Sequence, residues 1–206
     1  MSQYFEIHPV SPQLRLIRQA AEIVRQGGVV CYPTDSTYAI GCQMAEKGAL
    51  ERIRQLRQLG ADHNFTLLCR DLTDISNYAK VENTAFRQIK AHTPGPYTFI
   101  LTATRQVPRM TQHPKRKTIG IRVPENAICQ ALIAELGEPM LSTTLLLPGD
   151  DLPMTDPEDI RERIGKQVDL IIDGGNSLLE PSTVVDMSAE APVVTRRGLG
   201  DPAVFE

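Results

Sequence analysis

Five segments of the chain carry the hydrophobic spacing, or the start and stop signals, of amphipathic α-helices. In the first segment Ile17, Ala21 and Val24 lie on one helical face, and two glycines then end it. Proline near the first turn begins both this segment and the last one, where acidic residues also suit the helix dipole. The predicted helices cover residues 11–26, 50–57, 83–91, 126–136 and 156–164.

Short apolar runs between these helices predict β-strands, because proline, glycine or polar residues bound each run. The runs cover residues 29–32, 65–69, 97–104, 118–123, 140–147, 168–173, 182–187 and 192–196. Strands and helices interleave, but short, hairpin-like connections join the late strands, which favours a mixed sheet over a purely parallel one. No repeat or long linker divides the chain, so we expect one compact α/β domain.

Composition narrows the class of protein. The chain has 206 residues, of which 41% are apolar and 23% charged, as is ordinary for a globular domain. No run approaches the roughly 18 apolar residues that a membrane-spanning helix needs. The first six residues have neither the basic flank nor the apolar core of a signal peptide. We therefore expect a cytoplasmic protein with no membrane partner.

The four cysteines show no spacing typical of a metal site. They are separated by 11, 27 and 60 residues, without a Cys-x-x-Cys motif and without paired histidines at ligand spacing. Cys31 and Cys69 lie inside apolar strand-like runs. We expect reduced thiols that pack as small hydrophobic residues, no disulfide and no zinc site.

Charge is distributed unevenly along the chain. Residues 1–130 contain 17 Lys/Arg against 10 Asp/Glu, whereas residues 131–206 contain 5 against 15. This pattern argues against a uniformly basic nucleic-acid coat but permits one basic face. The alternative is that these charges are ordinary solvated surface.

Short hydroxyl side chains follow several of the predicted strands. Residues 34–38, Thr-Asp-Ser-Thr-Tyr, come directly after an apolar strand, and residues 142–144 and 182–183 repeat the theme. Ligands of open α/β sheets bind at the carboxyl ends of strands. These hydroxyls could therefore bind a small polar ligand, or they could form turns that satisfy their own backbone.

Several arginines are candidates for anion binding. Period-two alternation in residues 118–123 places Gly120 and Arg122 on the face opposite Ile121, where a mid-strand charge needs solvent or an anionic partner. Gly120 is expected to leave room beside Arg122, as a pocket would. The segment with Arg52, Arg54 and Arg57 could bind phosphates or form a solvated helix face. No glycine-rich phosphate loop is present, and no histidine pairs visibly with a nucleophile.

Five of these motifs follow one another in a characteristic order. Residues 33–41 resemble Pro-Thr-[Asp/Glu]-Thr-x-Tyr-Gly-Leu-Gly, residues 94–98 resemble Pro-Gly-Pro-x-Thr, and residues 118–124 resemble Thr-[Val/Ile]-x-[Val/Ile]-Arg-x-Pro. Residues 182–186, Ser-Thr-Val-Val-Asp, and the Arg-x-Gly at 196–198 complete the series. In this order they resemble the YrdC-like family, and within it the YciO branch.

The resemblance implies a YrdC-like domain over residues 14–200, with residues 1–13 as an N-terminal lead-in and residues 201–206 as a C-terminal tail. It implies a twisted mixed sheet flanked by helices around a concave, positively charged surface. Well-known members make L-threonylcarbamoyl-adenylate and pyrophosphate from L-threonine, bicarbonate and ATP, for the t6A modification of tRNA. Members are also described as binding double-stranded RNA.

By the same resemblance, Arg122 would hold the carboxylate of a threonine-like ligand, and Thr34, Thr37 and Ser182 would line that pocket. Contacts to the ATP phosphates or the adenylate would come from Arg57, Ser142, Thr144 and Arg196. Mg²⁺ would travel with ATP, and no tightly bound cofactor is expected. The motifs assign no catalytic residue.

Three positions depart from the synthase pattern. Arg57 stands without the usual Lys-x-Arg, residues 142–144 read Ser-Thr-Thr in place of Ser-x-Asn, and Cys69 falls where some members place a pocket histidine. Losing one oriented donor can cost about 10²–10³ in rate. We therefore expect a weakened or altered synthase activity. The alternative function is a double-stranded RNA-binding module, for tRNA or rRNA, without catalysis.

Overall fold

The strands of the protein form a single mixed sheet, seen in a computed structural model that describes residues 1–206 except the side chain of Asp74. The strand order is β1-β9-β2-β3-β8-β4-β7-β6-β10-β11, and β5 pairs with β6. Four of the pairs are parallel, namely β1 with β9, β9 with β2, β4 with β7 and β6 with β10. The strands are β1 (Gln3–Glu6), β2 (Val30–Pro33), β3 (Tyr38–Gln43), β4 (Thr66–Leu68), β5 (Ala79–Lys80), β6 (Tyr97–Ala103), β7 (Thr118–Arg122), β8 (Met140–Thr144), β9 (Leu170–Asp173), β10 (Thr183–Asp186) and β11 (Val193–Arg196).

All five predicted helices are present, and local signals explain where two of them begin. The side chain of Asn126 accepts a hydrogen bond from the backbone of Cys129, and that of Asp156 accepts one from Glu158. The helices are α1 (Leu14–Arg25), α2 (Lys47–Arg57), α3 (Leu72–Tyr78), α4 (Asn83–Ala91), α5 (Ala127–Leu136) and α6 (Pro157–Ile164), with short 3₁₀ turns at Arg109–Thr111 and Pro202–Phe205.

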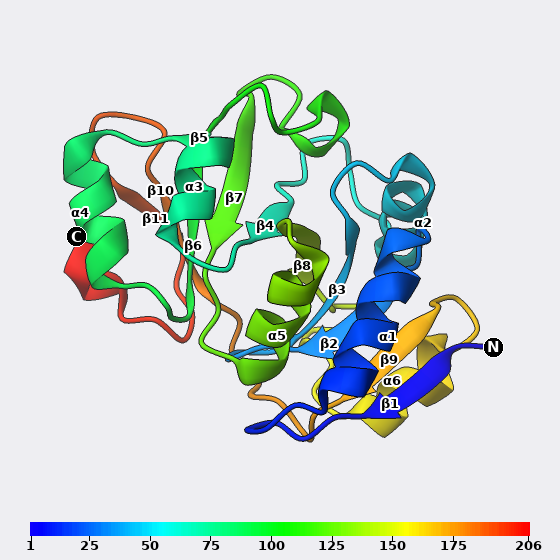
Figure 1. Ribbon diagram of the computed structural model, residues 1–206. Helices are drawn as coiled ribbons and strands as arrows, with labels where there is room; N and C mark the ends of the chain where they lie inside the picture. The colour runs from blue at the N-terminus through cyan, green and yellow to red at the C-terminus, as the bar shows by residue number, and fades with distance from the viewer.

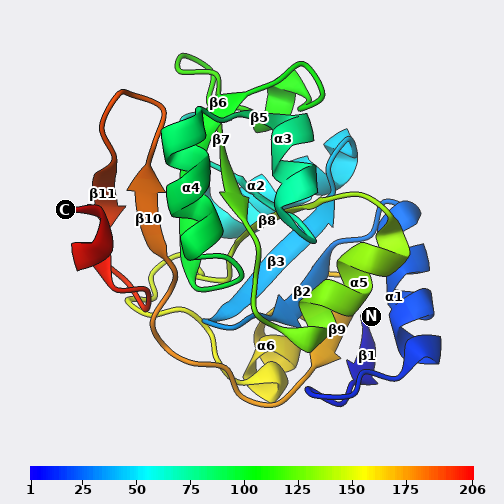
Figure 2. The same cartoon turned by 60° about the vertical axis from the view of Figure 1, so that its left-hand side comes forward.

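The two faces of the sheet are covered differently. Side chains of one face, such as Ile40, Leu67 and Phe99, share one core with buried residues of α2, α3, α4 and α6. On the other face α1 and α5 lie side by side and pack over β9, β2 and β3 (Figures 1 and 2). The buried residues on this side form a second core, and among the described residues α1 and α5 are the only helices that contribute to it. The strands β4, β7, β6 and β10 therefore present part of this face to a cavity.

The predicted fold class, a single-domain α/β mixed sheet, is confirmed, but four elements were not predicted. They are β1, β3, β5 and α3. β1 lies within the expected N-terminal lead-in, where it pairs with β9 at the edge of the sheet. β3 was not recognised because all but its last residue are buried, so it shows no alternation of polar and apolar side chains.

The four cysteines are buried in the core. Burial raises the pKa of the Cys42 thiol to about 12, and it raises the pKa values of Cys31 and Cys129 as well. Within the described part of the chain, no group of three or more His, Cys, Asp or Glu side chains could hold a metal ion. None of the described helices has the length and apolar character needed to cross a membrane.

Candidate functional site

A cavity of about 340 Å³ opens on the sheet face that α1 and α5 leave uncovered. Its floor follows the strand pairing, because Ser142 of β8 lies beside Thr66 of β4, and Thr66 lies beside Gly120 of β7. Alternate residues of each strand point to the same face, so the neighbouring strands supply one continuous row of short side chains. The floor residues are Ala39, Thr66, Leu68, Thr98, Ile100, Gly120, Arg122, Ser142, Thr144 and Val184.

Seven of the eight predicted site residues line this cavity: Thr34, Thr37, Arg122, Ser142, Thr144, Ser182 and Arg196. The eighth, Arg57, lines an adjoining cavity of about 470 Å³. The two cavities share His63, Thr143, Thr144 and Arg196 along their common edge. The structure therefore brings together residues from nearly the whole length of the chain.

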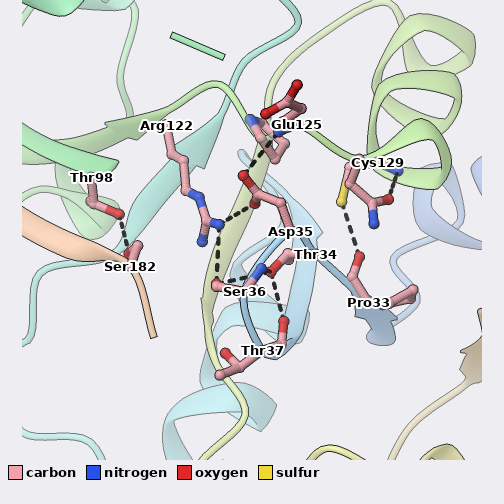
Figure 3. A network of polar contacts seen from close by, with 12 residues as sticks. Pro33, Thr34, Asp35, Ser36, Thr37, Thr98, Arg122, Glu125, Cys129 and Ser182 are labelled. Carbon is pink, nitrogen blue, oxygen red and sulfur yellow. Dashed lines mark hydrogen bonds and ion pairs between the residues drawn. The ribbon is translucent and has the colours of Figure 1, made fainter. Parts of the chain in front are cut away.

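Arg122 is buried at the cavity, where Asp35 is its counter-ion and one of its N–H groups has no partner among the described residues. Its Nη2 donates to the carboxylate of Asp35 and, at 3.1 Å, to the hydroxyl of Ser36 (Figure 3). The other carboxylate oxygen of Asp35 accepts a hydrogen bond from the backbone of Glu125 at 3.1 Å. The Nε of Arg122 is buried without a hydrogen-bond partner among the described residues. A buried guanidinium N–H without a partner is costly, so this group favours a ligand that accepts a hydrogen bond.

The turn after β2 holds Asp35 in place through its own hydroxyls. The Oγ1 of Thr34 accepts from the backbone N–H of Ser36 at 3.0 Å and donates to the carbonyl of Thr37 at 2.7 Å (Figure 3). Thr34 thus lines the cavity while its hydroxyl stabilises the turn. The sequence left two interpretations of this segment open, ligand binding and turn formation. The Thr34 hydroxyl forms the turn, whereas the side chain of Thr37 lines the cavity.

The far wall is held together by Ser182 and Arg196. The hydroxyls of Thr98 and Ser182 lie 2.8 Å apart, which ties β6 to the start of β10 (Figure 3). Arg196 of β11 donates to the carbonyl of Ser182 through Nε at 3.0 Å and Nη2 at 2.8 Å. Desolvation, together with the positive charge of Arg122, lowers the pKa of Arg196. Ser182 therefore positions a cation at the cavity edge.

Only one of the three arginines on the second predicted helix reaches the site. Arg57 donates through Nε to the carbonyl of Leu146 at 2.5 Å and through Nη1 to the hydroxyl of Thr143 at 3.1 Å. Burial, together with the charge of Arg196, lowers the pKa of Arg57 to about 10. The other two have structural contacts, Arg52 with Asp169 and Arg54 over the ring of Phe65.

Two features of the site differ from the expectation or were not predicted. A Cβ atom on Gly120 would lie 2.7 Å from the Oγ1 of Thr66, so this glycine permits close packing of Thr66 rather than leaving open room beside Arg122. Residues 62–64, Asp-His-Asn, line the cavity from the loop before β4. Their sequence carries no pattern that links them to Arg122.

Comparison with known proteins identifies the family. The sequence model named Sua5/YciO/YrdC, described as telomere recombination, matches residues 22–198. The chain belongs to the Sua5/YciO/YrdC family. The uncharacterised protein YciO of Escherichia coli K12 is 58% identical over 205 residues, with 100% of each chain covered. The crystal structure of E. coli YciO superimposes with a TM-score of 0.98 and likewise covers 100% of each chain.

More distant relatives of the Sua5/YciO/YrdC family have a named activity. A threonylcarbamoyl-AMP synthase of Idiomarina loihiensis is 31% identical over 160 residues, covering 75% of this chain and 84% of the synthase. Sua5 of P. abyssi, crystallised in complex with L-threonine, matches with a TM-score of 0.89 and 26% identity, covering 96% of this chain and 58% of Sua5. The fold predicted from the motifs is thus shared with a threonine-binding protein.

Proposed function

We propose that the protein binds a threonine-like amino acid and ATP in the paired cavities, as a paralogue of L-threonylcarbamoyl-adenylate synthase with weakened or altered activity. In the full reaction, the amine of L-threonine and bicarbonate condense to a carbamate with loss of water, and a carbamate oxygen then attacks the α-phosphorus of ATP. Threonylcarbamoyl-AMP forms and pyrophosphate leaves. ATP brings its own Mg²⁺ to the phosphates.

The observation that carries this proposal is the burial of Arg122 at the cavity with an Nε that has no hydrogen-bond partner among the described residues. A guanidinium that is buried yet has an unpartnered Nε suits a carboxylate, which accepts hydrogen bonds in the same plane as the guanidinium fork. The short hydroxyls of Thr37 and Ser182 line the same cavity, whose volume of about 340 Å³ fits a small amino acid with part of a nucleotide. Arg196 and Arg57 lie farther out, which supports a phosphate position toward the second cavity.

The same geometry supports a reduced adenylation rate. Arg57 donates to Leu146 and Thr143, so its bonds to the protein compete with bonds to a phosphate. Thr144 at the common edge offers a hydroxyl where the synthase pattern has a carboxamide. Because oriented donors act on the charge that develops in the transition state, such changes reduce turnover more than binding.

Pyrophosphate release tests the proposal. Purified protein is incubated with MgATP, bicarbonate and L-threonine, and the wild type is compared with Arg122→Ala and Arg196→Met. Arg163→Met is the matched control, because Arg163 pairs with Asp150 on the surface and does not line either cavity. We expect threonine-dependent release in the wild type and the control only. Release no higher than that of Arg122→Ala would reject the synthase proposal.

A second candidate function, binding of double-stranded RNA such as tRNA or rRNA, is favoured by the connection between β6 and β7. Its five basic side chains are all exposed: Arg105, Arg109, Lys115, Arg116 and Lys117. The connection contacts α2, because Arg54 of that helix donates to the carbonyl of Met110 at 3.3 Å. A phosphate backbone laid along this connection would therefore meet several cations.

Salt dependence tests the RNA candidate. For about four phosphate contacts, affinity should fall about a hundredfold between 50 and 200 mM salt. Replacing Lys115 and Lys117 together by Gln should weaken RNA binding and reduce its dependence on salt. Lys166→Gln is the control, because Lys166 is exposed but lies in the acidic part of the chain, and it should change neither. An affinity that is independent of salt contradicts phosphate-dominated binding.

A further inference from the structure

His63 occupies a defined position at the common edge of the two cavities, although no motif assigns it a role. It lies in the loop between α2 and β4 and is half-buried. Its Nε2 lies 3.0 Å from the hydroxyl of Thr143, and its ring meets the ring of Phe65 edge-on at a centroid distance of 5.0 Å. These contacts fix the imidazole between the amino-acid and phosphate positions proposed above.

The surroundings of His63 are cationic. The hydroxyl of Thr143 that meets its Nε2 also accepts a hydrogen bond from Arg57. Burial lowers the pKa of His63 to about 4, and the positive charges of Arg57, Arg54 and Arg196 act in the same direction. At neutral pH the imidazole is therefore uncharged. The acidic side chains that also face these cavities are Asp62, Asp151 and Glu180.

We propose that His63 is an additional ligand contact, which takes up one proton from solvent when a phosphoryl group binds in the cavity that it lines with Arg57 and Arg196. This inference rests on the proposed function, in which the phosphates of the nucleotide occupy that cavity. The entering anion offsets the positive field of the two arginines. The imidazolium then becomes a third cationic hydrogen-bond donor to the phosphoryl oxygens.

The expected shift follows from the general effect of a nearby opposite charge. Such a charge within about 4–6 Å moves a pKa by about 1–3. The pKa of His63 should therefore rise from about 4 to roughly 5–7 in the complex. The extra affinity is present below the bound-state pKa and is lost as the pH rises through it. For a bound pKa of about 6, pyrophosphate should bind about fourfold more tightly at pH 5.5 than at pH 7.5 through His63 alone.

Proton NMR of the histidine rings in the wild-type protein measures this directly. The chain has four histidines, and one ring should titrate near pH 4 without ligand and at a higher pH with saturating pyrophosphate. This measurement does not depend on the folding of a variant. If pyrophosphate binds and the ring still titrates near pH 4, the inference is wrong while the binding site stands.

Calorimetry at pH 5.5, between the free and the expected bound pKa of His63, in buffers of different ionisation enthalpy counts the protons taken up with pyrophosphate. His63→Gln is the informative variant, because a Gln amide can still bond Thr143 but cannot take up a proton. His8→Gln is the control, since His8 is exposed and lines neither cavity. We expect wild type and control to take up more protons than His63→Gln. Equal proton uptake in all three proteins overturns the role of His63 but leaves the proposed function standing. If none of the three binds pyrophosphate, both the role of His63 and the proposed function are refuted.

Discussion

Replacing Asp35 by Asn should destabilise the protein strongly, because it leaves the Arg122 guanidinium buried without a counter-ion. The two side chains are 11% and 8% exposed, so water cannot replace the lost charge. The amide oxygen can still accept the hydrogen bond from Arg122, and the bond from Arg122 to Ser36 at 3.1 Å is unaffected. The amide NH2 cannot accept the bond that the backbone N–H of Glu125 donates to Asp35, so that bond is lost. The perturbation therefore removes the negative charge and one hydrogen bond, and it preserves the shape of the side chain.

The size of the effect follows from this geometry. Removing one partner of a buried ion pair costs about 3–5 kcal/mol. The remaining hydrogen bonds place Asp35→Asn at the lower end, about 3 kcal/mol. For a chain of 206 residues this corresponds to a decrease in Tm of about 6–12 °C. An anionic ligand that contacts Arg122 should restore part of the loss, because it supplies the missing negative charge.

Urea unfolding followed by circular dichroism measures the free energy of unfolding of the wild type and of Asp35→Asn. Asp150→Asn is the control, because Asp150 pairs with Arg163 at the surface, and we expect its unfolding midpoint to stay almost unchanged. A double variant, Asp35→Asn with Arg122→Met, should be more stable than Asp35→Asn alone, since it removes the unpaired charge. A loss below about 1 kcal/mol in Asp35→Asn, or no gain in the double variant, would refute the reasoning.

Three further substitutions test the cavity floor. Thr144→Asn restores a carboxamide at the edge of the cavity and should increase pyrophosphate release by at least about tenfold, measured under the conditions used for the wild type. Tyr32→Phe removes the buried hydroxyl bonded to Ser142 and should cost about 1 kcal/mol in urea unfolding. Gly41→Ala should cost about 3 kcal/mol in the same assay, because its Cβ would lie 2.6 Å from the carbonyl oxygen of Leu141.

Each of the three substitutions has an outcome that would contradict its explanation. Unchanged turnover in Thr144→Asn would show that the carboxamide is not the missing part and would favour the RNA-binding alternative. For the glycine, Gly60→Ala is the control, because its Cβ would meet nothing nearer than 3.8 Å; equal effects at the two positions would contradict the packing argument. A Tyr32→Phe protein as stable as the wild type would mean that the hydroxyl of Ser142 finds another partner.

Local patterns predicted the elements whose signals lie within one segment. The helix over residues 126–136 is correct almost to the residue, because an Asn cap and a terminal glycine define its two ends. In β7, alternation correctly placed Gly120 and Arg122 on one face. The short β5 and the almost fully buried β3 were missed, since their stability comes from pairing with other strands rather than from their own pattern.

The sequence by itself therefore determined the fold class and the set of strand-end residues that surround the cavity. Its period-two and period-3.6 patterns and its ordered motifs are properties of neighbouring residues. Only the tertiary structure decided which charges meet. Asp35 and Arg122 are 87 residues apart, and His63 reaches Thr143 over 80 residues. Strand order and register bring the two members of each pair together, and burial then changes what each group can bind. A local sequence pattern contains neither the strand order nor the burial.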